Sequence, residues 1–367
     1  VGQQAQHFNP QWLHQQLVAH REYRMRFADR VYKHFFNDGV MTPPVAASLL
    51  TARKDTIDLA IIAESARWGD AKVTKPRTRD DDWLPQVRFL LNDYFPKRTD
   101  IVLAQFKTKG WYPSVEAPAF NQHGGAVESG FDLVMTAPAG EIYYTLDGSD
   151  PRLPGGAVNA GALAYAGPVV LTESTQARAR ALQGGVWSAV HDVTFAVGPV
   201  AESLRISEIM YHPMDTGDAD DPGAEYVELT NIADETINLH LVRFTNGIDF
   251  LFPSFELAPG ARCLVVDDVG AFEARYGPGL PIAGQYAGKL ANEGETVTLV
   301  DGSAGTVAEF RYNDRGGWPI EADGAGHSLV AVAEAGSPND KDYWRASAYV
   351  GGSPGADDPD VEAALAF

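Results

Sequence analysis

The sequence predicts a multidomain chain in which an N-terminal all-α segment is followed by two all-β sandwiches. Three observations support this prediction. At 367 residues the chain is long enough for two or three domains. Apolar residues recur at helical spacing only as far as about residue 112. After about residue 128 apolar and polar residues alternate, and glycine, with 36 residues in the whole chain, supplies the turns that short strands need.

The first two helices are marked by their start signals. Asn9-Pro10 and Thr42-Pro43 each combine an N-cap residue with a proline suited to the first turn of a helix. Apolar residues from Leu13 to Phe35 follow at helical spacing, so one helix is expected there. Gly39 is expected to end it as a left-handed C-cap.

Two further helices are expected before residue 112. Apolar residues from Trp83 to Tyr94 predict the third, and Thr99 is expected to cap a fourth, short helix that Gly110 ends. The run Asp80-Asp-Asp82 lies before the third helix, where carboxylates favour the positive end of the helix dipole. The alternative use of this run is as one half of a carboxylate pair for glycoside hydrolysis.

The change of pattern along the chain sets the expected domain boundaries. Prolines and the pair Gly124-Gly125 break the helical period and indicate a linker. The expected parts are a helical segment (1–112), a linker (113–127), a first sandwich (128–198), a second sandwich (199–355) and a tail (356–367).

Composition and charge exclude several classes of protein. A formal net charge of −20 is unsuited to nucleic acid, since binding to phosphates needs a basic surface. No apolar run approaches the 18 residues of a membrane span. Cys263 is the only cysteine, so an intrachain disulfide and a cysteine-built zinc site are both excluded, and this residue is expected to fill the core.

The second sandwich resembles a lamin-tail domain, which has an immunoglobulin-like fold. The resemblance covers residues 201–355 and implies a domain found in nuclear lamins and in many secreted bacterial proteins. It is carried by Ile206-Ser-Glu-Ile-Met-Tyr-His-Pro213, Glu225-Tyr-Val-Glu-Leu-Thr-Asn231, Gly317-Trp-Pro319, Asp323-Gly-Ala-Gly-His-Ser-Leu329, Trp344-Arg-Ala-Ser347 and Gly351-Gly-Ser-Pro-Gly355.

Two shorter resemblances cover most of the remaining chain. Residues 128–198 resemble the immunoglobulin-like C-terminal module of chitobiases through Ile142-Tyr-Tyr-Thr-Leu-Asp-Gly-Ser-Asp-Pro-Arg152, Tyr165-Ala-Gly-Pro168 and the strand from Ala177 to Ala181. Residues 8–123 resemble the helical C-terminal end of a spore-coat H (CotH) kinase-like protein through Phe27-Ala-Asp-Arg-Val31, Glu64-Ser-Ala-Arg-Trp-Gly-Asp70 and Tyr94-Phe-Pro-Lys-Arg98. That family's catalytic residues would lie upstream of Val1, so none is carried over to this chain.

A cluster of acidic residues gives the one candidate metal site. Flexible loops rich in carboxylates suit calcium, which prefers six to eight oxygen ligands. The spacing does not follow the EF-hand pattern, and a plain solvated acidic loop is the alternative. The candidate ligands are Asp215, Asp218, Asp220, Asp221 and Glu225. No other cofactor is expected.

Four aromatic residues are candidates for binding a ligand. Exposed rings on a sheet face can stack on sugars, whereas the alternative is packing in the core or at its rim. The candidates are Tyr144, Trp187, Trp318 and Trp344.

The sequence therefore favours a non-catalytic binding and spacer fragment of a larger bacterial protein, secreted or at the cell surface, without its export signal. A protein, an envelope component or a polysaccharide is the expected partner. No Gly-x-Ser-x-Gly elbow, Walker loop or His-Glu-x-x-His spacing occurs. Two alternatives stay open: a polysaccharide-active enzyme or its accessory module, and the regulatory end of a CotH-like kinase.

Overall fold

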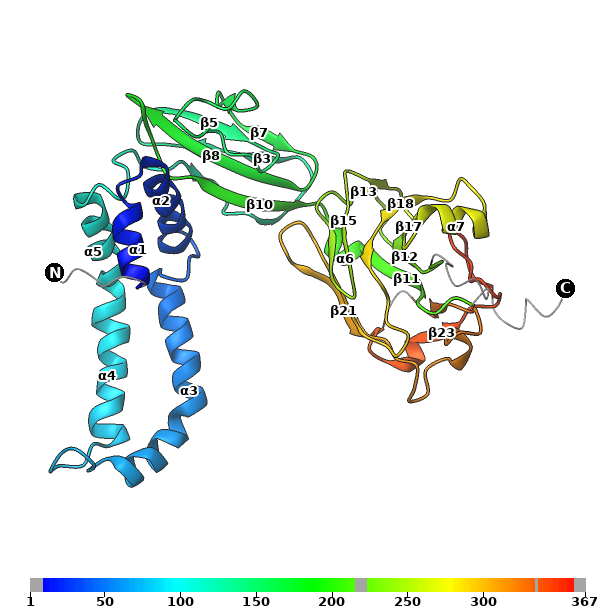
Figure 1. Cartoon of the computed structure of the whole chain (residues 1–367), viewed down its shortest axis with the longest axis horizontal. Coiled ribbons are helices and arrows are strands. Elements are labelled where there is room, and N and C mark those ends of the chain that lie inside the picture. The colour runs from blue at the N-terminus through cyan, green and yellow to red at the C-terminus, as the bar shows by residue number, and fades with distance from the viewer. Residues whose placement is uncertain (1–8, 215–222, 334–335, 360–367) are drawn as a thin grey trace. The chain divides into compact units, whose positions relative to one another are not determined.

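The computed structural model describes residues 9–214, 223–333 and 336–359 (Figure 1). It confirms the predicted fold class, with an N-terminal helical segment followed by β-rich, immunoglobulin-like parts. By their internal contacts the residues form two compact units. The first unit comprises residues 1–123, 134–168 and 177–193, and the second comprises residues 124–133, 169–176 and 194–367.

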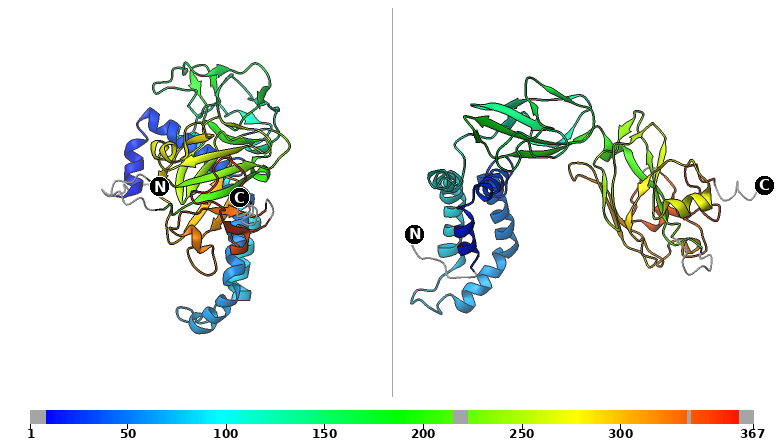
Figure 2. Two further views of the ribbon diagram at one scale, coloured as in Figure 1. Left: turned by 90° about the vertical axis from the view of Figure 1, so that its right-hand side faces the viewer. Right: turned by 45° about the horizontal axis from the view of Figure 1, so that its top comes forward.

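The helices of the first unit form a short bundle and a long hairpin. In chain order they are α1 (Pro10–Leu17), α2 (Arg21–Phe35), α3 (Pro43–Trp68), η1 (Arg79–Trp83), α4 (Leu84–Phe89), η2 (Leu90–Tyr94) and α5 (Phe95–Thr108). The helix from η1 to α5 runs antiparallel to α3, as Figures 1 and 2 show, and contacts it through η1 and α5. The remaining side of α3 carries no other described element.

The first helix starts where the sequence predicts but ends differently. The Asn9 side chain accepts a hydrogen bond from the Gln11 N–H, and Pro10 lies in the first turn. The predicted single helix is wrong, because the chain breaks between α1 and α2. Gly39 is not the left-handed residue: Asn37 has the positive φ, of 54°. Gly39 is needed for another reason, since a Cβ there would lie 2.5 Å from the His34 backbone.

The predicted third and fourth helices are one continuous helix. Thr99 therefore lies inside α5 instead of capping it, and its hydroxyl donates to the carbonyl of Met41 at 2.6 Å. Pro96 lies in the first turn of α5, directly after the π-helical turn η2. A wider turn relieves the clash between a proline ring and the preceding carbonyls, so the helix continues through the proline. Gly110 follows with a φ of 67°, as expected for a helix end.

The strands of the first unit pair around β8. They are β1 (Ala119–Phe120), β4 (Met135–Thr136), β5 (Glu141–Thr145), β6 (Leu163–Ala164), β8 (Thr175–Gln183), β9 (Val186–Trp187) and the start of β10 (His191–Val197). Antiparallel β5 pairs with β8 over five residues and also with β6, while β1 pairs with β4. Ala177, Ala179 and Ala181 are fully buried along β8, as their alternation predicts.

A buried guanidinium joins the helical segment to these strands. Arg180 of β8 has a side chain that is 1% exposed. It donates two hydrogen bonds of 2.8 Å to the Asp29 carboxylate in α2 and two of 2.7 Å to the Asp150 carboxylate. Asp29 also accepts from the Val190 N–H at 2.9 Å, and Arg180 donates to the Ser188 carbonyl. The pKa of Arg180 is raised above its ordinary value by the two carboxylates, against the opposing effect of its burial.

A second ion pair and an apolar cluster complete this joint. Arg152, 3% exposed, forms a two-bond pair with Glu22 of α2 at 2.7 and 2.8 Å. This arginine lowers the pKa of Glu22 to about 2. The apolar cluster contains Ala28, Val31, Tyr32, Tyr112, Ala117 and Ala189. Helix α2 is thus fixed to the strands by paired charges and by packing.

The second unit contains a sandwich of two sheets. Its elements before the sandwich are β2 (Gly125–Val127), β3 (Phe131–Leu133), β7 (Val169–Leu171), the end of β10 and α6 (Val200–Ser203). Its six-stranded sheet has the order β18 (Ile282–Gln285), β17 (Arg262–Val266), β12 (Tyr226–Asn231), β11 (Leu204–Met210), β22 (Leu329–Ala331) and β23 (Trp344–Ala346). Its five-stranded sheet has the order β19 (Ala287–Gly288), β15 (Ile248–Leu251), β14 (Arg243–Asn246), β20 (Thr296–Val300) and β21 (Thr306–Arg311). The short strands β13 (Ile237–Asn238) and β16 (Glu256–Leu257), with η3 (Ile320–Ala322) and η4 (Lys341–Tyr343), complete it.

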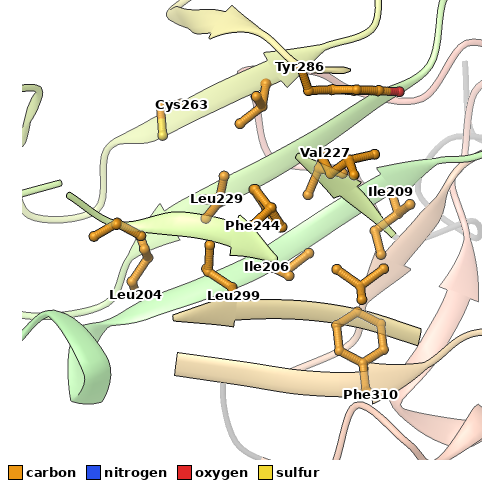
Figure 3. Close-up of a cluster of buried hydrophobic side chains, with 14 of the residues drawn as sticks. Leu204, Ile206, Ile209, Val227, Leu229, Phe244, Cys263, Tyr286, Leu299 and Phe310 are labelled. Carbon is orange, nitrogen blue, oxygen red and sulfur yellow. The ribbon is translucent and has the colours of Figure 1, made fainter. Parts of the chain in front are cut away.

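The core of this sandwich lies between its two sheets (Figure 3). Inward residues of β11 and β12, such as Ile206 and Val227, meet Phe244, Leu299 and Phe310 from the other sheet. Cys263 is fully buried there, which confirms its predicted role as a core residue, and burial raises the pKa of its thiol to about 12. Helix α7 (Val269–Tyr276) packs on the outer face of the six-stranded sheet through Phe272.

We predict that Asp29→Ala destabilises the first unit by about 3 kcal/mol, because it removes one of the two carboxylates that neutralise a buried arginine. Unfolding followed by calorimetry measures this. The matched control is Asp93→Ala, which breaks an exposed ion pair with Lys97 and should cost under about 0.5 kcal/mol. Equal losses for the two variants would contradict a central role for Asp29.

Candidate functional site

Two glutamates on the outer face of the six-stranded sheet form the most unusual group of charges in the second unit. Glu208 on β11 and Glu228 on β12 are directly opposite each other in the strand register. Their residues are 2% and 1% exposed. A register shift between Ile206 and Glu208 marks a bulge in β11 at this place. The sheet thus presents two buried carboxylates side by side on the face that does not meet the main core.

The carboxylate of Glu208 is surrounded by donors from three segments. Tyr226 donates its hydroxyl at 2.5 Å, and the Ser328 hydroxyl donates as well. The Ser353 N–H donates at 3.0 Å and the Ser353 hydroxyl at 3.4 Å. Gly352 must be glycine here, because a Cβ would lie 2.1 Å from the Tyr226 hydroxyl oxygen and 2.2 Å from a Glu208 oxygen.

The carboxylate of Glu228 is likewise surrounded by hydrogen-bond donors. It accepts from the Ser207 hydroxyl at 2.7 Å and from the Gly355 N–H at 2.6 Å. The Arg262 guanidinium lies 3.0 Å from it and also pairs with Asp357 at 2.7 Å. The segment from Gly351 to Asp358, which we call the strap, is therefore held down on the sheet by both glutamates.

The far end of the strap is fixed by Asp358. Its side chain is 1% exposed and pairs with Arg345 of β23. It also accepts from the Ala348 N–H at 2.9 Å and from the Ser353 hydroxyl at 2.9 Å. A polar cavity of about 420 Å³ lies between strap and sheet. Its lining includes Ser207, Glu208, Glu228, Arg262, Arg345 and Asp358.

The electrostatics of this cavity resemble those of an acid–base site, but the hydrogen bonds do not. Burial raises the pKa of Glu228 to about 7, helped by the neighbouring Glu208 and opposed by the Ser207 hydroxyl and Arg262. Burial also raises the pKa of Glu208. A general acid must reach its substrate, whereas these oxygens are taken up by donors of the chain itself. The arrangement anchors the strap.

Sequence analysis did not single out these two glutamates. Both lie within the strings that carry the lamin-tail resemblance, where each is a charged residue directly beside large apolar ones, Ile209 for Glu208 and Val227 and Leu229 for Glu228. A carboxylate among such residues in a predicted strand was the available signal. Their partners in the strap follow more than 120 residues later, beyond the reach of local patterns.

The predicted calcium loop is only partly within the described structure. Asp215, Asp218, Asp220 and Asp221 lie outside the described residues, so calcium binding stays a prediction. Glu225, the fifth candidate, is 4% exposed, and its Oε2 accepts from the Tyr286 hydroxyl and the Leu290 N–H, both at 3.0 Å. Within residues 9–214, 223–333 and 336–359, no three His, Cys, Asp or Glu side chains are grouped to hold a metal ion.

The four candidate aromatic residues lie mostly in cores. Tyr144, Trp187 and Trp344 are 8%, 1% and 4% exposed, and Trp318 is half-buried against the core of the second unit. The indole N–H of Trp187 donates to the Gly156 carbonyl, and that of Trp344 donates to the Pro338 carbonyl. Ligand binding at these residues stays a prediction, and the burial of three rings argues against it.

The remaining candidates have structural partners. Thr78 and Asp82 form reciprocal capping bonds at the start of η1, where Thr78 accepts from the Asp81 N–H and Asp82 accepts from the Thr78 N–H. Of the Asp run, the Asp82 carboxylate therefore caps the helix start, and the run lies inside the first turn, η1, where carboxylates favour the helix dipole. Arg79 of the same turn forms a two-bond pair with Asp58 of α3.

These observations define the class of the protein: a multidomain chain with a helical segment followed by immunoglobulin-like β modules. Residues 199–314 match the family model of the Lamin Tail Domain, and residues 132–195 match a family model described as Fn3 associated. The predicted lamin-tail resemblance is thus confirmed over that range. The chitobiase and CotH resemblances stay predictions.

The structural comparison adds little. A crystal structure of a DUF4876 family protein from Bacteroides thetaiotaomicron is similar at 10% identity and a TM-score of 0.29, covering 64% of this chain and 92% of that one. A TM-score this low does not establish a common fold. A search of curated proteins found no match. No helix of the described residues is both long and apolar enough to span a membrane.

We predict that Glu225→Ala destabilises the second unit by about 1 to 3 kcal/mol, because the Tyr286 hydroxyl and the Leu290 N–H lose their buried acceptor. The loss should be the same in EDTA and in millimolar calcium, since the carboxylate serves the core. Thermal unfolding in both buffers measures it. A loss seen only with calcium would instead make Glu225 a metal ligand.

The raised pKa of Glu228 predicts a pH dependence of stability. The folded carboxyl binds its proton up to about pH 7, whereas the unfolded one titrates near 4.5. The folded state therefore holds more protons in this window, and the unfolding free energy falls as the pH rises through it, by at most about 3 kcal/mol.

Urea unfolding of the whole chain between pH 5 and pH 8 tests this prediction. The Glu228→Gln variant should show a shallower decline over the window, because Gln does not titrate. An unchanged slope in the variant would mean that Glu228 titrates normally in the folded state.

Proposed function

We propose that this chain is a non-catalytic binding and spacer fragment of an extracellular bacterial protein. Lamin-tail and Fn3-associated modules of immunoglobulin type fit such a role. The observation that carries the proposal is that the strongly buried charged side chains form their hydrogen bonds and ion pairs with other groups of the same chain. Arg180, Glu208 and Glu228 bind groups of the chain itself, so these buried charges of the described residues are not free to act on a substrate.

The joint in the first unit supports the spacer part of the proposal. A spacer must hold its parts at a fixed distance, which requires that helix α2 does not swing on the strands. The four charge-assisted bonds around Arg180 and the Arg152–Glu22 pair restrict such motion in direction as well as in distance, because each arginine engages its carboxylates through two bonds.

One observation favours the alternative of a polysaccharide-active module. The cavity beneath the strap holds two adjacent carboxylates with raised pKa values, which is the equipment of glycoside hydrolysis. A sugar could reach them only after the strap is displaced, since Ser353 and Gly355 donate to the same oxygens. We therefore rank this alternative second. The regulatory end of a CotH-like kinase is a third, separate alternative. The chitobiase-type first sandwich is proposed as well.

The rigidity of the joint is testable by pulsed electron resonance. Nitroxide labels at Asp93→Cys and Leu163→Cys report the distance between the helical hairpin and strand β6, and the buried Cys263 should not react. With labelled chain diluted in unlabelled chain, we expect one narrow distance distribution, which Asp29→Ala broadens. A broad distribution in the parent chain would contradict a spacer.

The absence of catalysis is tested separately. The purified chain is assayed for hydrolysis of soluble polysaccharides and for phosphate transfer from ATP, and for binding to the same polysaccharides. We expect no turnover. Hydrolysis that Glu228→Gln abolishes would establish the second candidate in place of the first.

A further inference from the structure

The long helix α3 has an apolar face that no residue described in the first unit covers. Its 26 residues include none that is buried. Leu49 is 59% exposed and Leu59 is 79% exposed. The half-buried side, with Leu50, Ile57 and Ile61, is the one available for the contacts with η1 and α5. The helix is thus apolar on two opposite sides, which is typical of a helix packed between two partners.

The exposed side follows a strict seven-residue repeat. Its members are spaced alternately by four and three residues, which is the seam of a two-stranded coiled coil. None of them is charged. We call this face the α3 seam, and it comprises Leu49, Ala52, Thr56, Leu59, Ala63 and Ala66.

We propose that a second copy of this chain covers the seam, with the two α3 helices antiparallel. In the register that pairs residues whose numbers sum to 115, Leu49 faces Ala66 of the partner copy, Ala52 faces Ala63, and Thr56 faces Leu59. Every leucine then meets a small side chain, so the layers fill evenly. A parallel pair would instead stack Leu on Leu and Ala on Ala and leave alternating bulges and voids.

The charges beside the seam permit this pairing. Helix α3 carries three basic and three acidic residues, so two copies meet without the repulsion expected from a chain of net charge −20. The positions that flank the core pairs are offset from them, with numbers that sum to 113 on one side and 117 on the other, so Arg53 lies across from Ala60 and Asp55 across from Ile62. Like charges are therefore not opposed.

The size of the seam sets the expected strength. Six positions over 18 residues give a seam of about 27 Å by about 10 Å. This is smaller than the roughly 800 Å² that each partner contributes to a standard interface. We expect a dimer that dissociates at micromolar concentrations rather than a permanent one.

Cysteine cross-linking tests the arrangement directly, because Cys263 is buried and the chain has no other cysteine. Thr56→Cys lies near the two-fold axis, with its copies offset by about 4.5 Å along the helix, and should form a covalent dimer on mild oxidation. Leu49→Cys is the matched control, since its antiparallel copies are about 25 Å apart. A cross-link at both positions would mean a parallel pair, and none at Thr56 would mean no pair; either result overturns the proposal.

Sedimentation of the intact chain gives an independent readout. Leu59→Glu should raise the dimer dissociation constant at least tenfold without changing the melting temperature, because the side chain is exposed in the single chain. Leu163→Glu, at a leucine that is 56% exposed on β6, should leave dimerisation unchanged. A parent chain that stays monomeric up to 100 µM, or a dimer that Leu59→Glu does not weaken, would overturn the proposal.

Discussion

The side chain of Arg180 is the point on which the first unit depends. Removing a guanidinium from water costs several kcal/mol, which only well-placed carboxylates can offset. Asp29 and Asp150 come from a helix and from a turn before β6, so the arginine is stable only when both have arrived. Because the buried guanidinium needs both carboxylates, it stabilises only the one arrangement of helix and strands that brings them together.

The second unit uses the opposite polarity for a similar purpose. There the buried charges are anionic, and the chain surrounds them with hydroxyls, N–H groups and Arg262. In both units a buried charge fixes the position of a segment that is distant in sequence: helix α2 in the first unit and the strap in the second. This explains why perturbed pKa values in this protein accompany structural anchoring, although perturbed values in a cavity often mark a reaction centre.

Local signals predicted what depends on neighbouring residues. The start of α1 at Pro10 and the burial of Cys263 were foreseen, because caps and apolar runs act over a few positions. The alternation in β8 correctly placed its alanines inside, yet it would also place Arg180 on the solvent side. Its burial results from Asp29, 151 residues earlier. Thr99 was misjudged for a comparable reason, since a π-helical turn let the helix continue through Pro96.

The strap determines where a recombinant fragment of the last domain can end. The matched family region ends at residue 314, but β22, β23 and the strap follow it and complete the six-stranded sheet. A recombinant piece trimmed to the matched region would expose the edge of β11 and strip both buried glutamates of their N–H donors. Such a piece would be prone to aggregate, so a stable expression boundary lies beyond Asp358.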